Sequence, residues 1–183
     1  LINSFIKPKL GFTLKDLNTM KPAFLSNMIS VLLSMEHFPE FENEEGIDSH
    51  LQFRAKKHGK EVGGLETVEF QMKMLFCEDL HEQAEDLVDL VKHGDQLMKV
   101  TGKLAEIYMT QDLKKINRFM HKDSDKEDLK EMLDDRNMNW IGQMKTIMPE
   151  TPTMFVVGAG HLPGKNGVLS LLQKEGYTVE PVE

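Results

Sequence analysis

Two residues of this sequence combine a reactive side chain with a position that a ligand could reach. His161 ends the run Gly158-Ala159-Gly160-His161, which directly follows the apolar segment 154–157. Glu66 follows a pair of glycines at the end of a second short segment. In open α/β sheets, ligands collect outside the carboxyl ends of the strands, where glycines let backbone N–H groups approach a ligand closely. The sequence therefore predicts an imidazole and a carboxylate at one edge of a sheet.

An imidazole and a carboxylate are half of a divalent-metal site and also half of a general acid/base pair. Zinc, manganese and cobalt accept both ligand types, although a catalytic zinc takes about three protein ligands and only two are nominated here. Each residue also has a simpler interpretation: His161 could cap the turn, and Glu66 could be an anion at a helix N-terminus. We predict His161 and Glu66 as ligands of Mn²⁺, Co²⁺ or Zn²⁺ in an active protein, and no cofactor otherwise.

A further candidate lies in the middle of a long helix expected near the C-terminal end of the chain. Arg136 and Asn137 are three or four residues from Leu133 and Trp140, so the spacing places both on the apolar face of that helix. An unpaired charge there would cost several kcal/mol, so Arg136 needs a carboxylate, carbonyl or ligand as its partner. The predicted catalytic residues are Glu66, Arg136 and His161, and the predicted ligand-binding residues are Gly158, Gly160 and Asn137.

Other patterns indicate different chemistry. Gly158, Gly160 and Gly164 resemble the G-x-G-x-x-G fingerprint of nucleotide-binding turns, but the third glycine is one residue late. The thirteen methionines lie mostly on helical stripes, where methionine fills a core or lines an adaptable groove. A Met-lined groove would suit an apolar peptide, and a glycine-rich turn would suit a phosphate.

The charge balance narrows the classes of partner. The chain has 183 residues, with 22 Lys and Arg against 30 Asp and Glu, which gives a net charge of −8. Phosphate binding needs a concentrated basic surface, so nucleic acids and anionic membranes are excluded as default partners. The longest apolar runs have about five residues, far fewer than the roughly 18 that span a bilayer, so no transmembrane segment is predicted. A single cysteine, Cys77, forbids an intramolecular disulfide.

Helical spacing dominates the elements that must position these residues. Apolar residues recur at three and four, which predicts helices over about 22–38, 47–58, 67–120 and 126–148. Gly59 is expected to end the second of them in a left-handed conformation, and His93-Gly94 is expected to end a helix within the third.

Strands are predicted where the apolar residues lose the helical spacing: near Val62, at 154–157 and at 177–182. The last two flank a helix that starts at Pro163 and is capped by Gly176, and together they form a C-terminal strand-helix-strand unit. The sequence therefore predicts an α/β (α+β) fold with a helical insertion, a small sheet and this C-terminal unit. We expect residues 1–183 to form a single domain.

Three stretches of the sequence resemble the TraB/GumN (PrgY, Tiki) family. The first is the C-terminal stretch Phe155-Val156-Val157-Gly158-Ala159-Gly160-His161-Leu162-Pro163-Gly164, with Asn166-Gly167-Val168-Leu169 after it. The second is Gly64-Leu65-Glu66-Thr67, and the third is Arg136-Asn137 followed by Trp140, which looks like the R-N-x-x-W stretch of the family. The resemblance covers most of residues 41–183 and is most specific in the C-terminal stretch.

The resemblance implies a Tiki-like domain whose animal members are metal-dependent proteases with two G-x-x-H motifs and a glutamate at the site. It implies that His161 is the histidine of the second motif, Glu66 the glutamate and Arg136 the polar group near the site. This chain has one G-x-x-H and begins with Leu, so we expect the C-terminal two-thirds of such a protein, with the first motif on a missing N-terminal segment. The bacterial relatives are mostly uncharacterised, and many relatives suggest export or a cell-envelope location.

We predict a metal-dependent peptidase-like hydrolase that acts on a peptide or protein. His161 and Glu66 would hold the metal, and Arg136 would orient Glu66 or a substrate oxyanion. The alternative is a non-catalytic protein that binds or sequesters a peptide in a Met-lined groove, and phosphate or nucleotide binding at the glycine-rich turn is a third hypothesis. The first hypothesis requires the protein to bind a metal and the other two do not, so a measurement of bound metal distinguishes them. The sequence specifies neither an oligomeric state nor a compartment.

Overall fold

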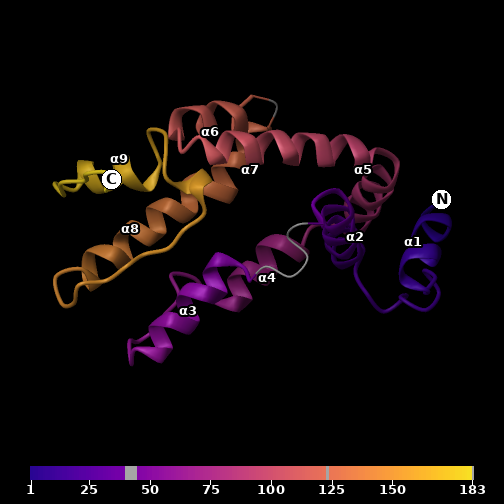
Figure 1. The fold of residues 1–183 in the computed structure, drawn as a ribbon, viewed down its shortest axis with the longest axis horizontal. Helices are drawn as coiled ribbons and strands as arrows, with labels where there is room; N and C mark the ends of the chain where they lie inside the picture. Colours follow the sequence, from indigo (N-terminus) through magenta and orange to yellow (C-terminus); the bar gives the residue numbers. More distant parts are fainter. Residues whose placement is uncertain (40–44, 123, 183) are drawn as a thin grey trace. The chain divides into compact units, whose positions relative to one another are not determined.

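A computed structural model describes residues 1–39, 45–122 and 124–182 of the chain (Figure 1). The chain divides into two units, Leu1–Thr101 and Gly102–Glu183. Helices form both units, and each unit has its own packing.

The first unit contains four helices and most of a fifth. These are α1 (Ile2–Leu10), α2 (Pro22–His37), α3 (Ile47–Lys57), α4 (Val68–Phe76) and α5 (Leu80–Met109), which continues past residue 101. The helices predicted over 22–38 and 47–58 are confirmed, and the stretch predicted as nearly all helix from 67 to 120 contains α4, α5 and α6. Gly59 follows α3 at φ 65°, so the predicted left-handed glycine is also confirmed.

A cluster of buried apolar side chains from α1, α2 and α5 forms the core of the first unit. The cluster contains Ile6, Leu25, Ile29, Leu33, Leu87 and Met98. The three residues that α2 contributes are four apart, which is the spacing that keeps side chains on one face of a helix. Burying such a face is what stabilises a helix in a protein, because short isolated helices are marginal in water.

Helix α5 bends at His93, next to the glycine at which it lies close to α2. His93 has non-helical dihedrals, φ −121° and ψ 15°, and the helix resumes after it. A Cβ atom built on Gly94 would lie 2.7 Å from Leu33 Cδ1, so the glycine allows close contact between the two helices. The helix end predicted at His93-Gly94 is therefore a kink within α5, because α5 continues its packing on the far side of the glycine.

One buried amide joins three segments of the first unit. The Gln83 side chain is 1% exposed. Its Oε1 accepts from the backbone N–H of Ala23 at 3.2 Å, and its Nε2 donates to the carbonyls of Phe76 and Glu78 at 3.3 and 2.9 Å. The first N–H groups and last C=O groups of a helix have no partner within the helix. Gln83 thus satisfies orphan groups at the start of α2 and after α4.

The second unit begins with the last residues of α5, and short helices and turns follow (Figure 1). They are α6 (Leu113–Met120), α7 (Lys126–Leu129), the π-helical turn η2 (Lys130–Asp134), α8 (Asp135–Ile147), the 3₁₀ turn η3 (Ala159–His161) and α9 (Val168–Lys174). The helix predicted over 126–148 is confirmed as α7, η2 and α8 in succession. Helix α9 packs against α8, and an ion pair between Lys145 and Glu175 raises the pKa of Lys145 through its hydrogen bond to the carboxylate.

The predicted α/β (α+β) fold is wrong for this chain. The described residues contain no strand, so neither a small sheet nor a C-terminal strand-helix-strand unit is present among them, and the fold is helical. A strand needs a neighbour for its N–H and C=O groups, and no described segment supplies one to the extended chain around Val62 or at 154–157. These segments lie at the surface, with Val62 42% and Met154 74% exposed, where water can satisfy the backbone.

The last helix also starts later than predicted. Helix α9 begins at Val168, and Pro163 lies in the turn that precedes it. A Cβ atom on Gly167 would come within 2.1 Å of the Pro163 carbonyl oxygen, so residues 163–167 fold back tightly before the helix can begin. Gly176 follows the helix at φ 91°, as its predicted capping role requires.

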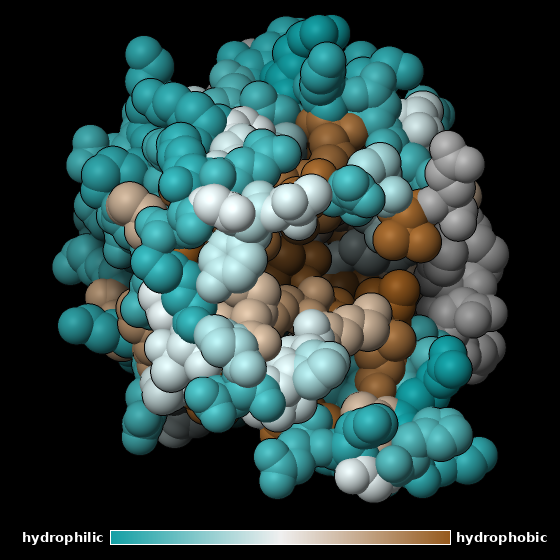
Figure 2. Space-filling model, turned by 90° about the vertical axis from the view of Figure 1, so that its left-hand side faces the viewer, coloured by the Kyte–Doolittle hydropathy of each residue, from teal (hydrophilic) through white to brown (hydrophobic). Residues whose placement is uncertain are grey.

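Large apolar side chains also occur on the surface. The side chains of Val68, Met109 and Met154 are each more than 70% exposed. Figure 2 shows one face of the molecule, on which hydrophilic residues cover most of the protruding surface and hydrophobic residues are also visible. Among the described helices, none has both the length and the apolar character that crossing a membrane requires.

Replacing Ile29 by Ala should destabilise the first unit. Ile29 is fully buried in the α2 face, and truncating such a side chain costs about 2–5 kcal/mol through lost burial and a residual cavity. Val31 lies on the same helix and is 52% exposed, so Val31→Ala is the matched control, with a change within about 0.5 kcal/mol. Urea denaturation followed by circular dichroism measures both. Equal losses in the two variants would contradict this account of the core.

Candidate functional site

The G-x-x-H run forms a tight turn that buries its histidine. The backbone N–H of His161 donates to the carbonyl of Gly158 at 2.9 Å, which closes the 3₁₀ turn η3. The His161 residue is 8% exposed. A Cβ atom on Gly160 would lie 2.7 Å from Met120 Sδ, so glycine at this position lets α6 pack against the turn. A Cβ atom on Gly158 would lie 3.7 Å from His161 Cδ2, which is ordinary contact.

The His161 ring lies between an amide and an indole of α8. Its Nδ1 is hydrogen-bonded to Asn137 Oδ1 at 2.8 Å, and its ring centroid lies 4.4 Å from that of Trp140, with the planes tilted by 43°. Asn137 Nδ2 donates to the His161 carbonyl at 3.4 Å. The structure therefore brings two of the predicted site residues, Asn137 and His161, into direct contact.

Arg136 contacts the same Trp140 ring that packs against His161. The Arg136 side chain is half-buried; its Nη1 donates to the Met132 carbonyl at 3.1 Å, and its Cζ lies 5.1 Å from the centroid of the Trp140 ring. A guanidinium over an indole face is a favourable cation–π arrangement. Arg136 was expected to need a carboxylate, a carbonyl or a ligand; the structure gives it a carbonyl and, in addition, an aromatic face.

Glu66 belongs to the first unit, at the bend that precedes α4. Its half-buried carboxylate accepts from Gln71 Nε2 at 3.2 Å. Thr67 is the N-cap of α4, with its Oγ1 accepting from the Phe70 N–H at 3.1 Å. A Cβ atom on Gly64 would lie 2.9 Å from the Glu66 carbonyl oxygen, so the glycine makes the tight bend possible. Because Glu66 and His161 lie in different units, their pairing stays a prediction.

The side chains around His161 fit one metal ligand rather than a complete site. A histidine that binds a metal through one ring nitrogen usually has the other nitrogen hydrogen-bonded to an oxygen acceptor, and Nδ1 of His161 has such a partner in Asn137. In the part of the chain that the structure describes, no group of three or more His, Cys, Asp or Glu side chains is arranged to hold a metal ion.

Two residues that the sequence analysis did not select as site residues, Asn166 and Asp134, are linked to His161 through Asn137. Asn137 Nδ2 donates to the Asn166 carbonyl at 2.9 Å, and Asn166 Nδ2 donates to Asp134 Oδ2 at 2.6 Å. These residues border a small polar pocket of about 50 Å³, together with Asn117, His121 and the glycines at 160, 164 and 167. The sequence signals for Asn166 were its position between glycines and its place in the C-terminal stretch that resembles the family, and neither indicates its partner.

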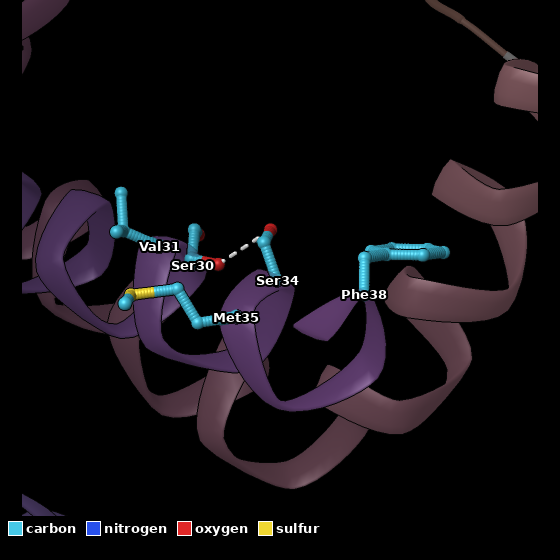
Figure 3. Close-up of a pocket in the computed structure, with 5 residues that line it drawn as sticks. All are labelled: Ser30, Val31, Ser34, Met35 and Phe38. Carbon is cyan, nitrogen blue, oxygen red and sulfur yellow. Dashed lines mark hydrogen bonds between the residues drawn. The ribbon is translucent and has the colours of Figure 1, made fainter. Parts of the chain in front are cut away.

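A second concave surface lies on α2 in the first unit (Figure 3). It is an open groove of about 310 Å³ lined by Ser30, Val31, Ser34, Met35 and Phe38. Ser34 Oγ donates to the Ser30 carbonyl at 2.8 Å, so this hydroxyl is satisfied within the helix. Met35 is the one methionine among these lining residues, and Val31 and Phe38 are the other apolar side chains.

Comparison with known proteins gives the family. The model of the TraB/PrgY/gumN family matches residues 3–181, and the chain belongs to that family. Among curated proteins, the chain is 23% identical over 199 residues to a metalloprotease TIKI homolog of Nematostella vectensis, covering 92% of this chain and 42% of that protein. It is 28% identical over 106 residues to metalloprotease TIKI1 of Homo sapiens, covering 50% of this chain and 20% of that protein.

The resemblance seen in the sequence is therefore confirmed at the level of the family. The chain spans less than half the length of the curated relatives that it matches. No solved structure matches it.

Gly167→Ala should disrupt the turn that holds His161, because the new methyl group would lie 2.1 Å from the Pro163 carbonyl oxygen. We expect the melting temperature of the second unit to fall sharply. Gly142→Ala is the matched control: nothing lies within 4 Å of its Cβ position, and alanine favours a helix over glycine by up to about 1 kcal/mol. Thermal unfolding that is unchanged in Gly167→Ala would contradict the described turn.

The cap of α6 should make the second unit sensitive to acid. The backbone N–H groups of Lys115 and Lys114 donate to Asp112 Oδ1 and hold the pKa of Asp112 below its ordinary value of 3.8. Because the folded pKa is lowered, this stabilisation is present above pH 3.8 and is lost as the pH falls through the lowered pKa. Asp112→Asn keeps a capping oxygen that does not titrate, so it should reduce the loss of stability in acid, as measured by urea midpoints at neutral and acidic pH. An identical acid response in the variant would exclude this cause.

Proposed function

We propose that this chain contributes to a metal-dependent, peptidase-like hydrolase of the TraB/PrgY/gumN family, with a peptide or protein as its substrate. The observation that carries the proposal is the buried G-x-x-H histidine, His161, held at Nδ1 by an amide oxygen. The family assignment and the similarity to animal metalloproteases support it.

In this proposal His161 and Glu66 are ligands of one divalent ion, either Mn²⁺, Co²⁺ or Zn²⁺. A bound metal of this kind supplies a coordinated water of lowered pKa and polarises a peptide carbonyl. Neutral imidazole and carboxylate are ligand types that all three ions accept. Burial of the His161 side chain keeps bulk water from one side of this ligand, which strengthens electrostatic interactions there.

Arg136 has a supporting role in the proposed site. Arg136 contacts the same Trp140 ring that packs on His161, so one indole links its permanent positive charge to the histidine. Arginine suits the recognition of a carboxylate or an oxyanion because its planar fork donates two hydrogen bonds at once. We therefore assign Arg136 to orienting Glu66 or a substrate oxyanion, and Gly158 and Gly160 to the backbone that borders the ligand.

The proposal also includes the source of the remaining ligands. Two ligands are fewer than the roughly three that a catalytic zinc takes from a protein, and this chain contains one G-x-x-H run. We propose that residues 1–183 act as one domain and that a segment outside them supplies the first G-x-x-H histidine.

The test is the affinity of Mn²⁺, Co²⁺ and Zn²⁺ for the 183-residue chain and for a longer gene product that carries both motifs, measured by calorimetry. We expect the longer protein to bind one ion and His161→Ala to weaken that binding by at least roughly tenfold, because replacing even a residue that only supports a ligand costs about 10–100-fold. His81→Ala is the control, since His81 is 84% exposed and pairs with Glu85.

The same proteins should then be assayed for cleavage of unstructured peptides with and without the bound ion. Loss of cleavage in His161→Ala, with His81→Ala unaffected, is the expected result. Metal binding and cleavage that survive His161→Ala would refute the assignment of His161.

The α2 groove favours the second candidate, a protein that binds a peptide without cleaving it. The groove is open and largely apolar, and 52% of Val31 and 40% of Met35 are exposed. Apolar helix grooves accept the apolar face of a peptide helix. If no metal binds to either protein, and an apolar peptide binds saturably with an affinity that Met35→Lys lowers, the second candidate replaces the first.

A further inference from the structure

The hydrogen bonds of Asn137 determine which ring nitrogen of His161 carries the proton. Asn137 Nδ2 lies 2.9 Å from the Asn166 carbonyl oxygen and 3.4 Å from the His161 carbonyl oxygen. Carbonyl oxygens only accept, so the amide NH₂ must be on this side and the amide oxygen on the other. That oxygen faces His161 Nδ1 at 2.8 Å and can only accept, so Nδ1 must donate.

A neutral imidazole with its proton on Nδ1 has its lone pair on Nε2. Free histidine prefers the opposite tautomer, so the protein selects the less common one. The Asn137 residue is 2% exposed, which means that water does not replace this amide oxygen as a partner. The tilted Trp140 ring, 4.4 Å away, restricts rotation of the imidazole about its side-chain bond.

The amide of Asn137 is itself oriented by a residue 29 positions further along the chain. Asn166 accepts through its backbone carbonyl, and its own side chain donates from Nδ2 to Asp134 Oδ2 at 2.6 Å. Hydrogen bonds to a carboxylate are stronger than those between neutral groups. Asp134 lies in η2, one turn before Asn137, so one stretch of helix contacts the Asn166 loop at two points.

We propose that Asp134, Asn166 and Asn137 are positioning residues that hold His161 as the Nδ1–H tautomer, with Nε2 presented as the ligand atom. The inference rests on the proposed function only for the use made of Nε2; the tautomer belongs to the metal-free protein. Asn137 therefore acts through His161 in this proposal, and the ligand-binding role predicted for it stays a prediction.

The experiment is long-range ¹⁵N–¹H correlation NMR of the metal-free, ¹⁵N-labelled chain, above the ordinary histidine pKa of about 6.5, where imidazoles are neutral. The two tautomers give different patterns of nitrogen shifts, and the His161 signals are identified by their absence from His161→Gln. We expect the Nδ1–H pattern in the wild type, a change toward the Nε2–H pattern in Asn137→Ala, and a partial change in Asp134→Ala.

Conservative and neighbouring variants distinguish positioning from general loss of structure. Asp134→Asn keeps an acceptor for Asn166 and should restore the wild-type pattern. Asp135→Ala removes a neighbouring carboxylate that pairs with Lys130 and should leave the pattern unchanged. If Asn137→Ala does not fold, the wild-type spectrum still tests the proposal, because it shows which tautomer of His161 is present. A wild-type Nε2–H pattern, or Asp134→Ala without effect on the tautomer, would overturn the proposal.

A measurement of metal affinity separates this inference from the proposed function. In the longer gene product, Asn137→Ala should weaken binding of the same ions by about 10–100-fold, the usual cost of losing a residue that orients a metal ligand. If the wild-type chain shows the Nδ1–H tautomer and the longer protein binds no metal, the proposed function fails while the positioning inference holds. If metal binds and the tautomer is Nε2–H, the positioning inference fails while the proposed function holds.

Discussion

A buried side-chain amide that must satisfy every one of its polar atoms is the constraint on which the second unit depends. Asn137 projects from α8 into a site with two carbonyls on one side and an imidazole on the other, and it matches all three. Leaving a buried donor or acceptor unmatched costs about 1–3 kcal/mol, so the turn at 158–161 and the loop up to Asn166 are fixed relative to α8 by the same few atoms. The first unit uses the same device, because Gln83 satisfies backbone groups at the start of α2 and after α4.

Glycines determine where these segments can approach one another. Gly94 leaves space for the Leu33 side chain of α2, and Gly160 leaves space for the Met120 side chain of α6. Gly167 lets the chain fold back on Pro163 before α9 begins. Each does so because no Cβ atom is present. Gly164, at φ 92°, differs from these three because its backbone conformation is one that other residues rarely adopt. Gly160 of the G-x-x-H stretch thus has a packing role that is independent of any ligand.

Much of the helical structure was predictable from spacing, and so was one member of the site. The apolar repeats located α2, α3 and the run from α7 to α8, and helix geometry placed Asn137 on the buried face of α8. The predicted strands were wrong, because four apolar residues in a row at 154–157 do not specify a hydrogen-bonding neighbour. The contact of Asn166 with Asp134 joins residues 32 positions apart, and no periodicity carries such information. The pairing of Glu66 with His161 spans two units and remains a prediction.

The π-helical turn η2 has a consequence for how the sequence can change by insertion or deletion. Within it, the N–H of Asp135 donates to the carbonyl of Lys130, five residues back, so the turn holds one residue more than a regular helix would. Each residue of a regular helix rotates the chain by about 100°. A π turn needs more residues for one revolution, so its five residues cover nearly the rotation of four in a regular helix. Deleting a single residue from 130–134 would therefore convert the turn to ordinary helix and leave the orientation of α7 about the axis of α8 nearly unchanged. Helix α7 thus keeps its orientation, while the sequence spacing between its residues and the face that holds the histidine is one residue longer than in a regular helix.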